Sequence, residues 1–219
     1  MIVTYLGHEC FKLQYGDLTI AINPPSKDSD FKSSKFGADV VLQTIEHSDM
    51  NGGKDMSYGD TVPFVISGPG EYETNGIFVH GIAGVSEYDS KNINTENGAG
   101  GKRVNTIYSL SVDGINMLFL GAQSGPLPST LSAAIDVVDL LFIPIGGNGV
   151  YDAKEAYKIG LNLEAKMIIP MHFKSEKEEC VKQFLKESGS NVSAIDKLTI
   201  KRKDVENKEG EVVLLSPQV

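Results

Sequence analysis

The sequence predicts an α/β protein in which β-sheets are covered by helices in layers. Two observations support this class: short strands fill the first half of the chain, and apolar strands alternate with helices in the second half. A chain of 219 residues, 41% of them hydrophobic, can build one compact core. We therefore expect a single domain that spans residues 1–219.

Short segments with strand-like patterning make up the N-terminal half. Residues 2–6, 11–15 and 18–22 alternate with period two, and Gly16 and Asp17 supply a turn, which predicts a β-meander. Residues 23–37 are rich in Pro, Ser, Lys and Asp, which predicts a surface loop. Further strands are expected, with a turn at Asp113 and Gly114, in residues 40–44, 64–67, 77–82, 106–112 and 115–121.

The second half combines buried strands with amphipathic helices. Residues 140–145 and 166–173 are apolar strands, and two further strands are expected in residues 197–216. The spacing predicts one helix whose inward face carries Ala153, Ala156, Tyr157, Gly160 and Leu161. A second helix is predicted from a capping box and a terminal glycine, with the pattern Ser175, Glu178, Val181, Phe184, Leu185 and Gly189.

Charge and composition exclude several classes of function. A net charge of -9 disfavours nucleic acid as a general partner. The chain has no apolar run of roughly 18 residues and no signal-peptide pattern, so we expect a cytoplasmic protein that does not enter a membrane. Cys10 and Cys180 are too far apart in sequence for a zinc ribbon, and no disulfide framework is indicated. Residues 84–103 lack periodicity and could form a lid, an interface or a disordered segment.

Three of the four histidines, His8, His47 and His172, stand at the ends of predicted strands, where sites of α/β proteins are usually built. His80 lies inside a strand and is expected to be structural. The segment QTIEHSDM, residues 43–50, adds Asp49 two positions after His47. These residues predict a polar cleft at one sheet edge.

Several separated blocks carry a resemblance to a known family: YLGHECFKL, ADVVLQTIEHSDMNG, ISGPGEYETNGIFVHGI, NTIYSLSVDGINMLFLGAQSG, DLLFIPIGG and AKMIIPMHF. In this order they resemble the metallo-β-lactamase fold, in a branch similar to the ascorbate-phosphate lactonases. The resemblance implies a four-layer αββα sandwich of hydrolase ancestry, with ester, lactone or phosphoester substrates. It places the site where residues 42–50, 121–123 and 171–173 meet.

The same resemblance implies a metal site with missing ligands. The family binds two metal ions, usually zinc, through a His-x-His-x-Asp-His signature, a later histidine, a bridging aspartate and a final histidine. Here the signature keeps His47 and Asp49, and the final histidine is His172. Isoleucine, methionine, alanine and tyrosine stand at or near the other ligand positions, namely Ile45, Met50, Ala122 and Tyr88. The dinuclear centre is therefore predicted to be largely lost, since a catalytic zinc ion commonly has three protein ligands.

Two functions remain open from the sequence. In the first, the protein is a non-catalytic relative that binds a small-molecule ligand and holds no metal tightly. In the second, it is a weak hydrolase with one divalent ion, zinc, manganese or iron, bound by His47, Asp49 and His172, with His47 and Asp49 as catalytic residues. His8 could join that ion or could hydrogen-bond a loop.

Other residues could border the cleft. Glu46 and Ala122 lie in the matching segments, and Glu71 and Tyr72 belong either to a cleft loop or to a plain turn. Residues 145–149, IGGNG, could in principle cradle a phosphate, but a turn from strand to helix is favoured because the Walker lysine is absent. A homo-oligomer is possible.

Overall fold

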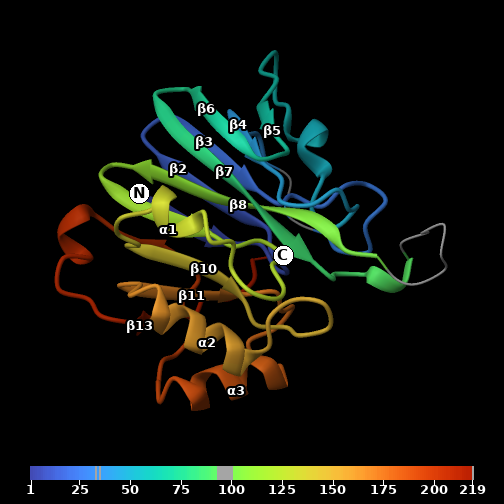
Figure 1. Ribbon diagram of the computed structural model, residues 1–219. Helices are drawn as coiled ribbons and strands as arrows, with labels where there is room; N and C mark the ends of the chain where they lie inside the picture. The colour runs from blue at the N-terminus through green and yellow to red at the C-terminus, as the bar shows by residue number, and fades with distance from the viewer. Residues whose placement is uncertain (33, 35, 93–100, 219) are drawn as a thin grey trace.

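Two β-sheets pack face to face in the computed structural model, which describes residues 1–32, 34, 36–92 and 101–218 (Figure 1). The first sheet has the strand order β12-β1-β2-β3-β4-β5, and the second has β13-β11-β10-β9-β8-β7-β6. The strands of the first sheet are β1 (Ile2–Tyr5), β2 (Phe11–Tyr15), β3 (Leu18–Ile22), β4 (Val40–Leu42), β5 (Phe64–Ile66) and β12 (Leu198–Thr199). Those of the second are β6 (Gly70–Thr74), β7 (Ile77–Ser86), β8 (Arg103–Val112), β9 (Ile115–Phe119), β10 (Leu140–Pro144), β11 (Met167–Met171) and β13 (Glu211–Val212).

The predicted hairpins are confirmed. Strands β1, β2 and β3 form an antiparallel meander, and β8 and β9 pair across a tight turn. Asp113 and Gly114 both have positive φ, 56° and 69°, as a two-residue hairpin turn with right-handed strand twist requires. From β3 onward the first sheet is parallel, so the ends of β3 and β4 lie at the same edge.

Aromatic rings of the two sheets pack against each other in the core. Phe11 of the first sheet lies 5.0 Å from Phe142 and 5.7 Å from Phe119 of the second, between ring centroids, with near-perpendicular rings. All three side chains are fully buried. This edge-to-face packing adds to the stabilisation from burial and fixes the relative position of the sheets.

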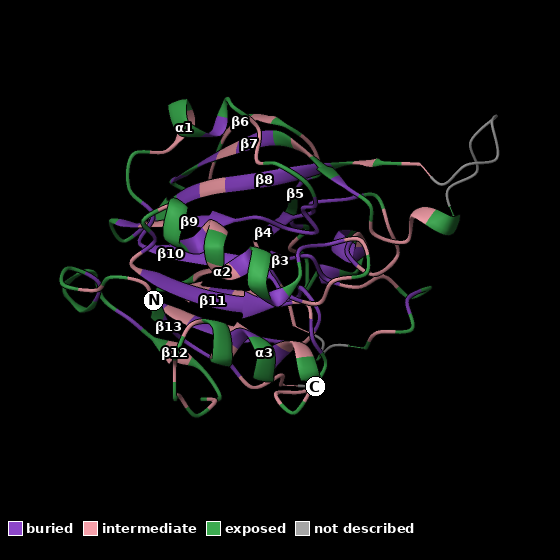
Figure 2. Ribbon diagram, turned by 60° about the horizontal axis from the view of Figure 1, so that its bottom comes forward, coloured by how far each residue is buried: buried purple, intermediate pink, exposed green. Residues whose placement is uncertain are grey.

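Helices α2 (Ala153–Asn162) and α3 (Glu179–Glu187) cover the outer face of β10 and β11 (Figure 2). Helix α2 begins with a capping box of Asp152 and Glu155. Its buried face consists of small residues, Ala153, Ala156 and Gly160, which let the helix approach the sheet closely. The prediction that Leu161 lies on this face is wrong: its side chain is 51% exposed, because it lies beyond the edge of the small-residue face.

Helix α3 buries Val181 and Phe184 as predicted, and Gly189 follows its end with φ 63°. The predicted start at Ser175 is wrong, because residues 175–178 form a turn and the helix begins after Glu178. The Glu178 carboxylate accepts hydrogen bonds from the backbone N–H groups of Lys174 and Ser175. Glu178 therefore orders the chain that leaves β11.

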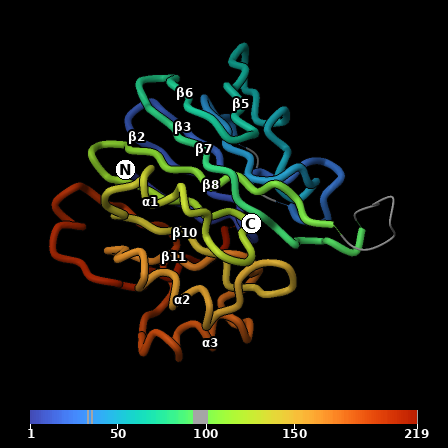
Figure 3. Tube along the Cα trace, in the orientation of Figure 1, coloured from blue at the N-terminus to red at the C-terminus, as the bar shows by residue number. Residues whose placement is uncertain are grey.

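The layer on the first sheet is much shorter. It contains the 3₁₀ helix η1 (Gly52–Met56), beside a small apolar cluster of Ala21, Ala38, Val41 and Met56. In Figure 3 the blue and cyan strands lie in the upper part of the view, and the orange helices lie in the lower part. The four-layer sandwich is thus present with unequal outer layers.

Some connecting elements and strand pairings were not predicted. A short helix, α1 (Leu131–Ala134), and two 3₁₀ turns, η2 (Ser90–Asn92) and η3 (Arg202–Asp204), lie in connecting segments. The two C-terminal strands do not form one hairpin, since β12 pairs with β1 and β13 pairs with β11. None of the helices in the described part of the chain is both long and apolar enough to span a bilayer.

Candidate functional site

The segments that follow the strands meet at one edge of the sandwich. Gly121 lies so close to Thr44 that a Cβ atom added there would stand 2.6 Å from the Thr44 Cβ. The Tyr88 ring lies 5.2 Å from the His172 ring and packs beside Ile45. The three segments expected to meet, 42–50, 121–123 and 171–173, therefore surround one region.

His8 and His172 form the innermost pair of this region, with ring centroids 4.1 Å apart. Both have left-handed backbone conformations, with φ of 55° and 70°, which are uncommon for residues other than glycine. Backbone hydrogen bonds join the two segments: the His8 N–H donates to the Phe173 carbonyl, and the His172 N–H donates to the His8 carbonyl. The buried Tyr5 hydroxyl also contacts the carbonyls of His8 and Phe173, at 2.8 and 2.6 Å.

Glu9 fixes the orientation of His172. The carboxylate of Glu9 is fully buried, accepts a hydrogen bond from His172 Nδ1 at 2.7 Å and accepts another from the Asn23 amide at 2.9 Å. Asn23 is in turn held by Thr44. Because Nδ1 donates to Glu9, Nε2 is the nitrogen of His172 that is left available to the cleft.

His8 is neutral in this environment. Burial lowers its pKa well below the usual value, and the nearby His172, Lys174 and His47 lower it further. Its Nε2 is buried and has no hydrogen-bond partner among the described residues. The ring stacks on Phe31 with centroids 4.1 Å apart and an interplanar angle of 12°. A neutral imidazole is the form expected for a base, a ligand or a hydrogen-bond donor.

His47 has both ring nitrogens engaged. The backbone N–H of Asp49 donates to Nδ1 at 3.2 Å, so the ring proton is assigned to Nε2, which faces the Asp89 carboxylate at 3.1 Å. Asp49 also has both carboxylate oxygens engaged, by the hydroxyls of Ser29 and Tyr88 at 2.5 and 2.7 Å. The polar side-chain atoms of His47 and Asp49 thus all have hydrogen-bond partners within the protein.

Tyr88 stands between the three histidines. Its ring centroid lies 5.1, 5.2 and 5.5 Å from those of His47, His172 and His8. Burial, followed by the hydrogen bond to Asp49, raises the pKa of its hydroxyl strongly, so the group remains a donor. One side of the ring packs against an apolar cluster made of Ile45, Met50, Ala122 and Val150. Three members of this cluster, Ile45, Met50 and Ala122, stand at positions where the resemblance implies metal ligands.

The segment 84–103 contributes directly to the cleft. Tyr88 and Asp89 follow the end of β7, and Arg103, the first residue of β8, donates to the backbone carbonyls of Tyr88 and Glu46. Glu46 itself accepts from Asn51 and lies at the exposed rim. Residues 93–100 of this segment lie outside the described residues, and the lid, interface or disorder expected for residues 84–103 stays a prediction.

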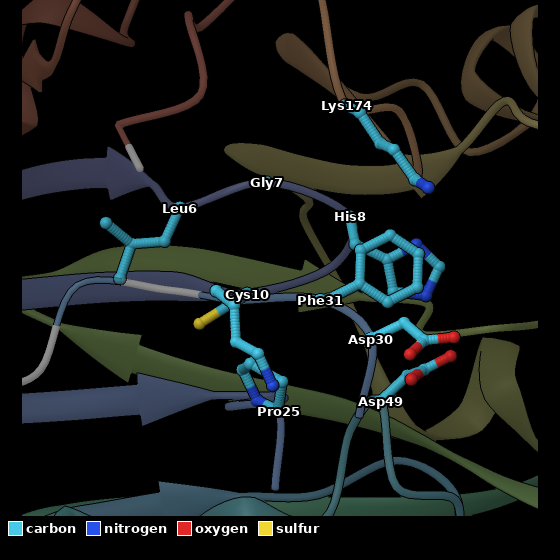
Figure 4. Close-up of a pocket in the computed structure, with 10 residues that line it drawn as sticks. Leu6, Gly7, His8, Cys10, Pro25, Asp30, Phe31, Asp49 and Lys174 are labelled. Atoms are coloured by element: carbon cyan, nitrogen blue, oxygen red, sulfur yellow. The ribbon is translucent and has the colours of Figure 1, made fainter. Parts of the chain in front are cut away.

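Three adjoining cavities open around these side chains. One of about 260 Å³ extends from His8 past Cys10 to Pro25 (Figure 4). A second of about 430 Å³ is lined by His47, Asp49 and other polar residues, and a third of about 200 Å³ lies beside His172. In Figure 4 the Lys174 side chain points toward Phe31 and His8, and the carboxylates of Asp30 and Asp49 lie side by side.

Two predicted border residues lie beside β7. Glu71 and Tyr72 pair with His80 and Val79 in the middle of β7, whereas the cleft lies beyond the end of this strand. Both residues lie in strand β6, the Tyr72 hydroxyl donates to the Gly68 carbonyl, and neither residue lines the three cavities described above, so their place at the cleft stays a prediction.

The IGGNG segment is a turn between β10 and α2, as favoured from the sequence. A Cβ atom at Gly146 would lie 2.5 Å from His172 Cδ2, so glycine is required there for the approach of His172. The segment serves as one wall of the cavity beside His172.

The donor groups do not fit a two-metal centre. Ile45 and Ala122 offer no donor atom, the thioether of Met50 is buried, and the nitrogens of His47 and the oxygens of Asp49 are engaged. Among the described residues, no group of three or more His, Cys, Asp or Glu side chains is arranged to hold a metal ion. Of the three ligands that the resemblance leaves, His172 alone keeps a ring nitrogen that makes no hydrogen bond to another described residue, fewer than the three protein ligands of typical catalytic zinc sites.

Several cleft residues were not found from the sequence. Glu9 could have been suspected from its place beside His8, and Lys174 from its place after His172. Ser29, Phe31 and Asp89 gave no signal, because they lie in polar segments without periodicity. The loop 23–37, predicted only as a surface loop, covers His8 through Phe31.

Comparisons with known proteins show what this chain is similar to. The profile of a family described as β-lactamase superfamily domain matches residues 2–172. A metal-dependent hydrolase of Natranaerobius thermophilus is 24% identical over 185 residues, covering 79% of this chain and 83% of that protein. Another of Carboxydothermus hydrogenoformans is 26% identical over 205 residues, covering 79% and 84%.

Solved structures agree with these matches. A Thermotoga maritima protein assigned as a Zn-dependent hydrolase of the metallo-β-lactamase superfamily is 27% identical, with a TM-score of 0.70, and the match covers 98% of this chain and 97% of that one. A Parabacteroides distasonis protein, 19% identical with a TM-score of 0.60 over 87% and 90% of the two chains, shares the fold.

Proposed function

Because the chain belongs to the metallo-β-lactamase superfamily, we propose that its cleft binds a small molecule in the place where relatives carry out metal-dependent hydrolysis, without a two-metal centre. One observation carries this proposal: His47 and Asp49, the surviving residues of the metal signature, already have their polar atoms engaged by Asp89, Tyr88 and Ser29. Displacing these partners would cost several hydrogen bonds before any ligand bond forms.

In this proposal the cleft residues act by binding and orienting. Glu9 holds His172 with Nε2 toward the cavity, Phe31 limits the access of water to His8, and Lys174 supplies a positive charge at the rim. Tyr88 and Asp49 keep the floor of the cleft rigid. The absence of nucleic-acid binding and the possibility of a homo-oligomer remain predictions.

A second candidate is a hydrolase that holds one divalent ion. The names of the relatives favour it more directly than the first, since they are called metal-dependent hydrolases. A carboxylate that orients an imidazole, as Glu9 orients His172, is also how proteins commonly hold a metal ligand. Zinc, manganese or iron would supply a water of lowered pKa for attack on an ester, lactone or phosphoester.

Elemental analysis separates the two candidates. We expect protein purified without chelators to carry far less than one equivalent of zinc, manganese or iron, and EDTA to leave its melting temperature unchanged. The Thermotoga maritima relative, purified in the same way, is the positive control. Close to one equivalent of metal that disappears in a His172→Ala variant, together with turnover of generic esters or phosphodiesters, would establish the hydrolase instead.

A further inference from the structure

We propose that the cavity beside the His8 and His172 pair is a subsite for a small anion, a carboxylate or a phosphate group, bound by His8, His172 and Lys174. This inference rests on the proposed ligand-binding role of the cleft and adds the chemical class of the ligand. Three independent features support it: an unpartnered buried nitrogen, an unpaired ammonium group and a cavity that both groups line.

The first feature is the Nε2 atom of His8. The residue is only 5% exposed, and its Nε2 lacks a hydrogen-bond partner within the described residues. A buried polar atom without a partner destabilises the folded state, so a ligand that accepts a hydrogen bond from this nitrogen would remove that cost. A neutral imidazole can present Nε2–H as a donor. His172 lines the same cavity, and because its Nδ1–H donates to Glu9, its Nε2 donates to an anion when the ring is protonated.

The second feature is the Lys174 ammonium group. Its Nζ lies 4.6 Å from the centroid of the Phe31 ring, and no carboxylate of the described residues pairs with it. Glu178, which also lines the cavity, uses one carboxylate oxygen to accept the backbone N–H groups of Lys174 and Ser175. Lys174 therefore has no ionic partner among the described residues, and a bound anion would supply one.

The local charges indicate the sign of the ligand. Lys174 is the only lysine or arginine among the described residues that line this cavity, and the one carboxylate there, that of Glu178, already accepts backbone hydrogen bonds. The adjoining cavities contain the carboxylates of Asp30, Asp49 and Asp89, which repel an anion. The anionic group is thus confined to the corner between His8, His172 and Lys174, and the rest of the ligand is expected to be neutral or cationic.

The cavity sizes fit a head group rather than a whole large ligand. The subsite measures about 200 Å³, and the neighbouring cavity of about 260 Å³ shares His8, Phe31 and Lys174 with it. That second cavity has apolar walls at Leu6 and Pro25. A small molecule with an anionic end and a less polar body would occupy both.

The test uses inorganic phosphate and, separately, acetate, titrated at constant ionic strength with EDTA present. The probe is the NMR signal of the histidine rings, since the chain has only four histidines. We expect the His8 and His172 signals to move and saturate, while the signals of His80, in the middle of β7, remain unchanged. Saturation by both anions indicates a general anion site, and saturation by phosphate alone assigns a phosphoryl group.

Three variants test which residues bind the anion. Lys174→Ala should weaken anion binding about tenfold, whereas Lys177→Ala, an exposed lysine three residues later, should leave it unchanged. His8→Asn should also weaken binding, because asparagine tolerates the left-handed backbone and lacks the ring nitrogen. Circular dichroism confirms that each variant is folded.

Equal shifts of all four histidines, no shifts at all, or equal losses in Lys174→Ala and Lys177→Ala would overturn the subsite. Elemental analysis of the same preparation, made before EDTA is added, keeps the two proposals apart. Bound metal, together with anion-dependent shifts of the His8 and His172 signals, would contradict the proposed function but support the anion subsite. A metal-free protein without shifts would contradict the subsite alone.

Discussion

At the scale of residues, Tyr88 links the three histidines of the candidate site to Asp49. It donates to Asp49, and its ring lies within 5.5 Å of the His8, His47 and His172 rings, between centroids. In the family that the sequence resembles, a metal-binding histidine is expected near this position. A large ring with one donor thus fills space that metal ligands and an ion would share.

Replacing Tyr88 with phenylalanine tests the role of its hydroxyl. We expect Tyr88→Phe to lower the free energy of unfolding by about 1–2 kcal/mol, because the half-buried Asp49 carboxylate loses a hydrogen bond. Urea denaturation measures the change. Tyr15→Phe is a matched control, since the Tyr15 hydroxyl donates to Asp113 at the exposed surface and its loss should have little effect. Equal effects of the two substitutions would contradict a structural role for the Tyr88 hydroxyl.

At the scale of elements, the loop 23–37 covers the site. Phe31 stacks on His8, and Ser29 donates to Asp49, so two contacts fasten the loop across the cleft. Nothing in the polar composition of this loop indicates such contacts. The residues that follow β11 approach from the other side, where Lys174 lies over the Phe31 ring.

Shortening Phe31 should expose His8 to water. Burial is the largest cause of the low pKa of His8, so Phe31→Ala should raise that pKa toward its usual value of about 6.5. An NMR titration of the histidine rings measures the shift. Phe36→Ala is the control, since Phe36 packs against the small cluster on the outer face of the first sheet. An unchanged pKa of His8 in Phe31→Ala would show that the loop does not shield the ring.

At the scale of the whole molecule, His8 links folding to pH. Its pKa is lower in the folded state than in the unfolded chain, so below about pH 6.5 the unfolded chain binds a proton that the folded protein excludes. Stability should therefore be constant above this pH and fall as the pH decreases toward the folded pKa. Between pH 7.5 and 5.5 we expect a loss of about 1 kcal/mol from this residue, measured by urea denaturation.

The His8→Asn variant removes this contribution. Its free energy of unfolding should change less than that of the wild-type protein over the same pH range, because asparagine does not titrate. A pH dependence that the substitution leaves intact would assign the effect to other groups.

The sequence alone determined most of the framework. Period-two segments gave the antiparallel strands, apolar runs gave β10 and β11, and the ordered blocks of residues indicated the metallo-β-lactamase fold, which the family match confirms. It also placed His8, His47, Asp49 and His172 near one edge, since the segments that follow parallel strands lie together. Local patterns could do this because strand and turn preferences act over a few residues.

Only the tertiary structure decided what these residues contact. Glu9 is buried under His172, Phe31 reaches across from a loop, and Tyr88 enters from the segment after β7. Each of these contacts joins positions far apart in sequence, and none follows from periodicity. The sequence therefore identified the positions at which the resemblance implies metal ligands, whereas the fold determined that the apolar residues there form one cluster, with a hydrogen-bonded tyrosine packed against it.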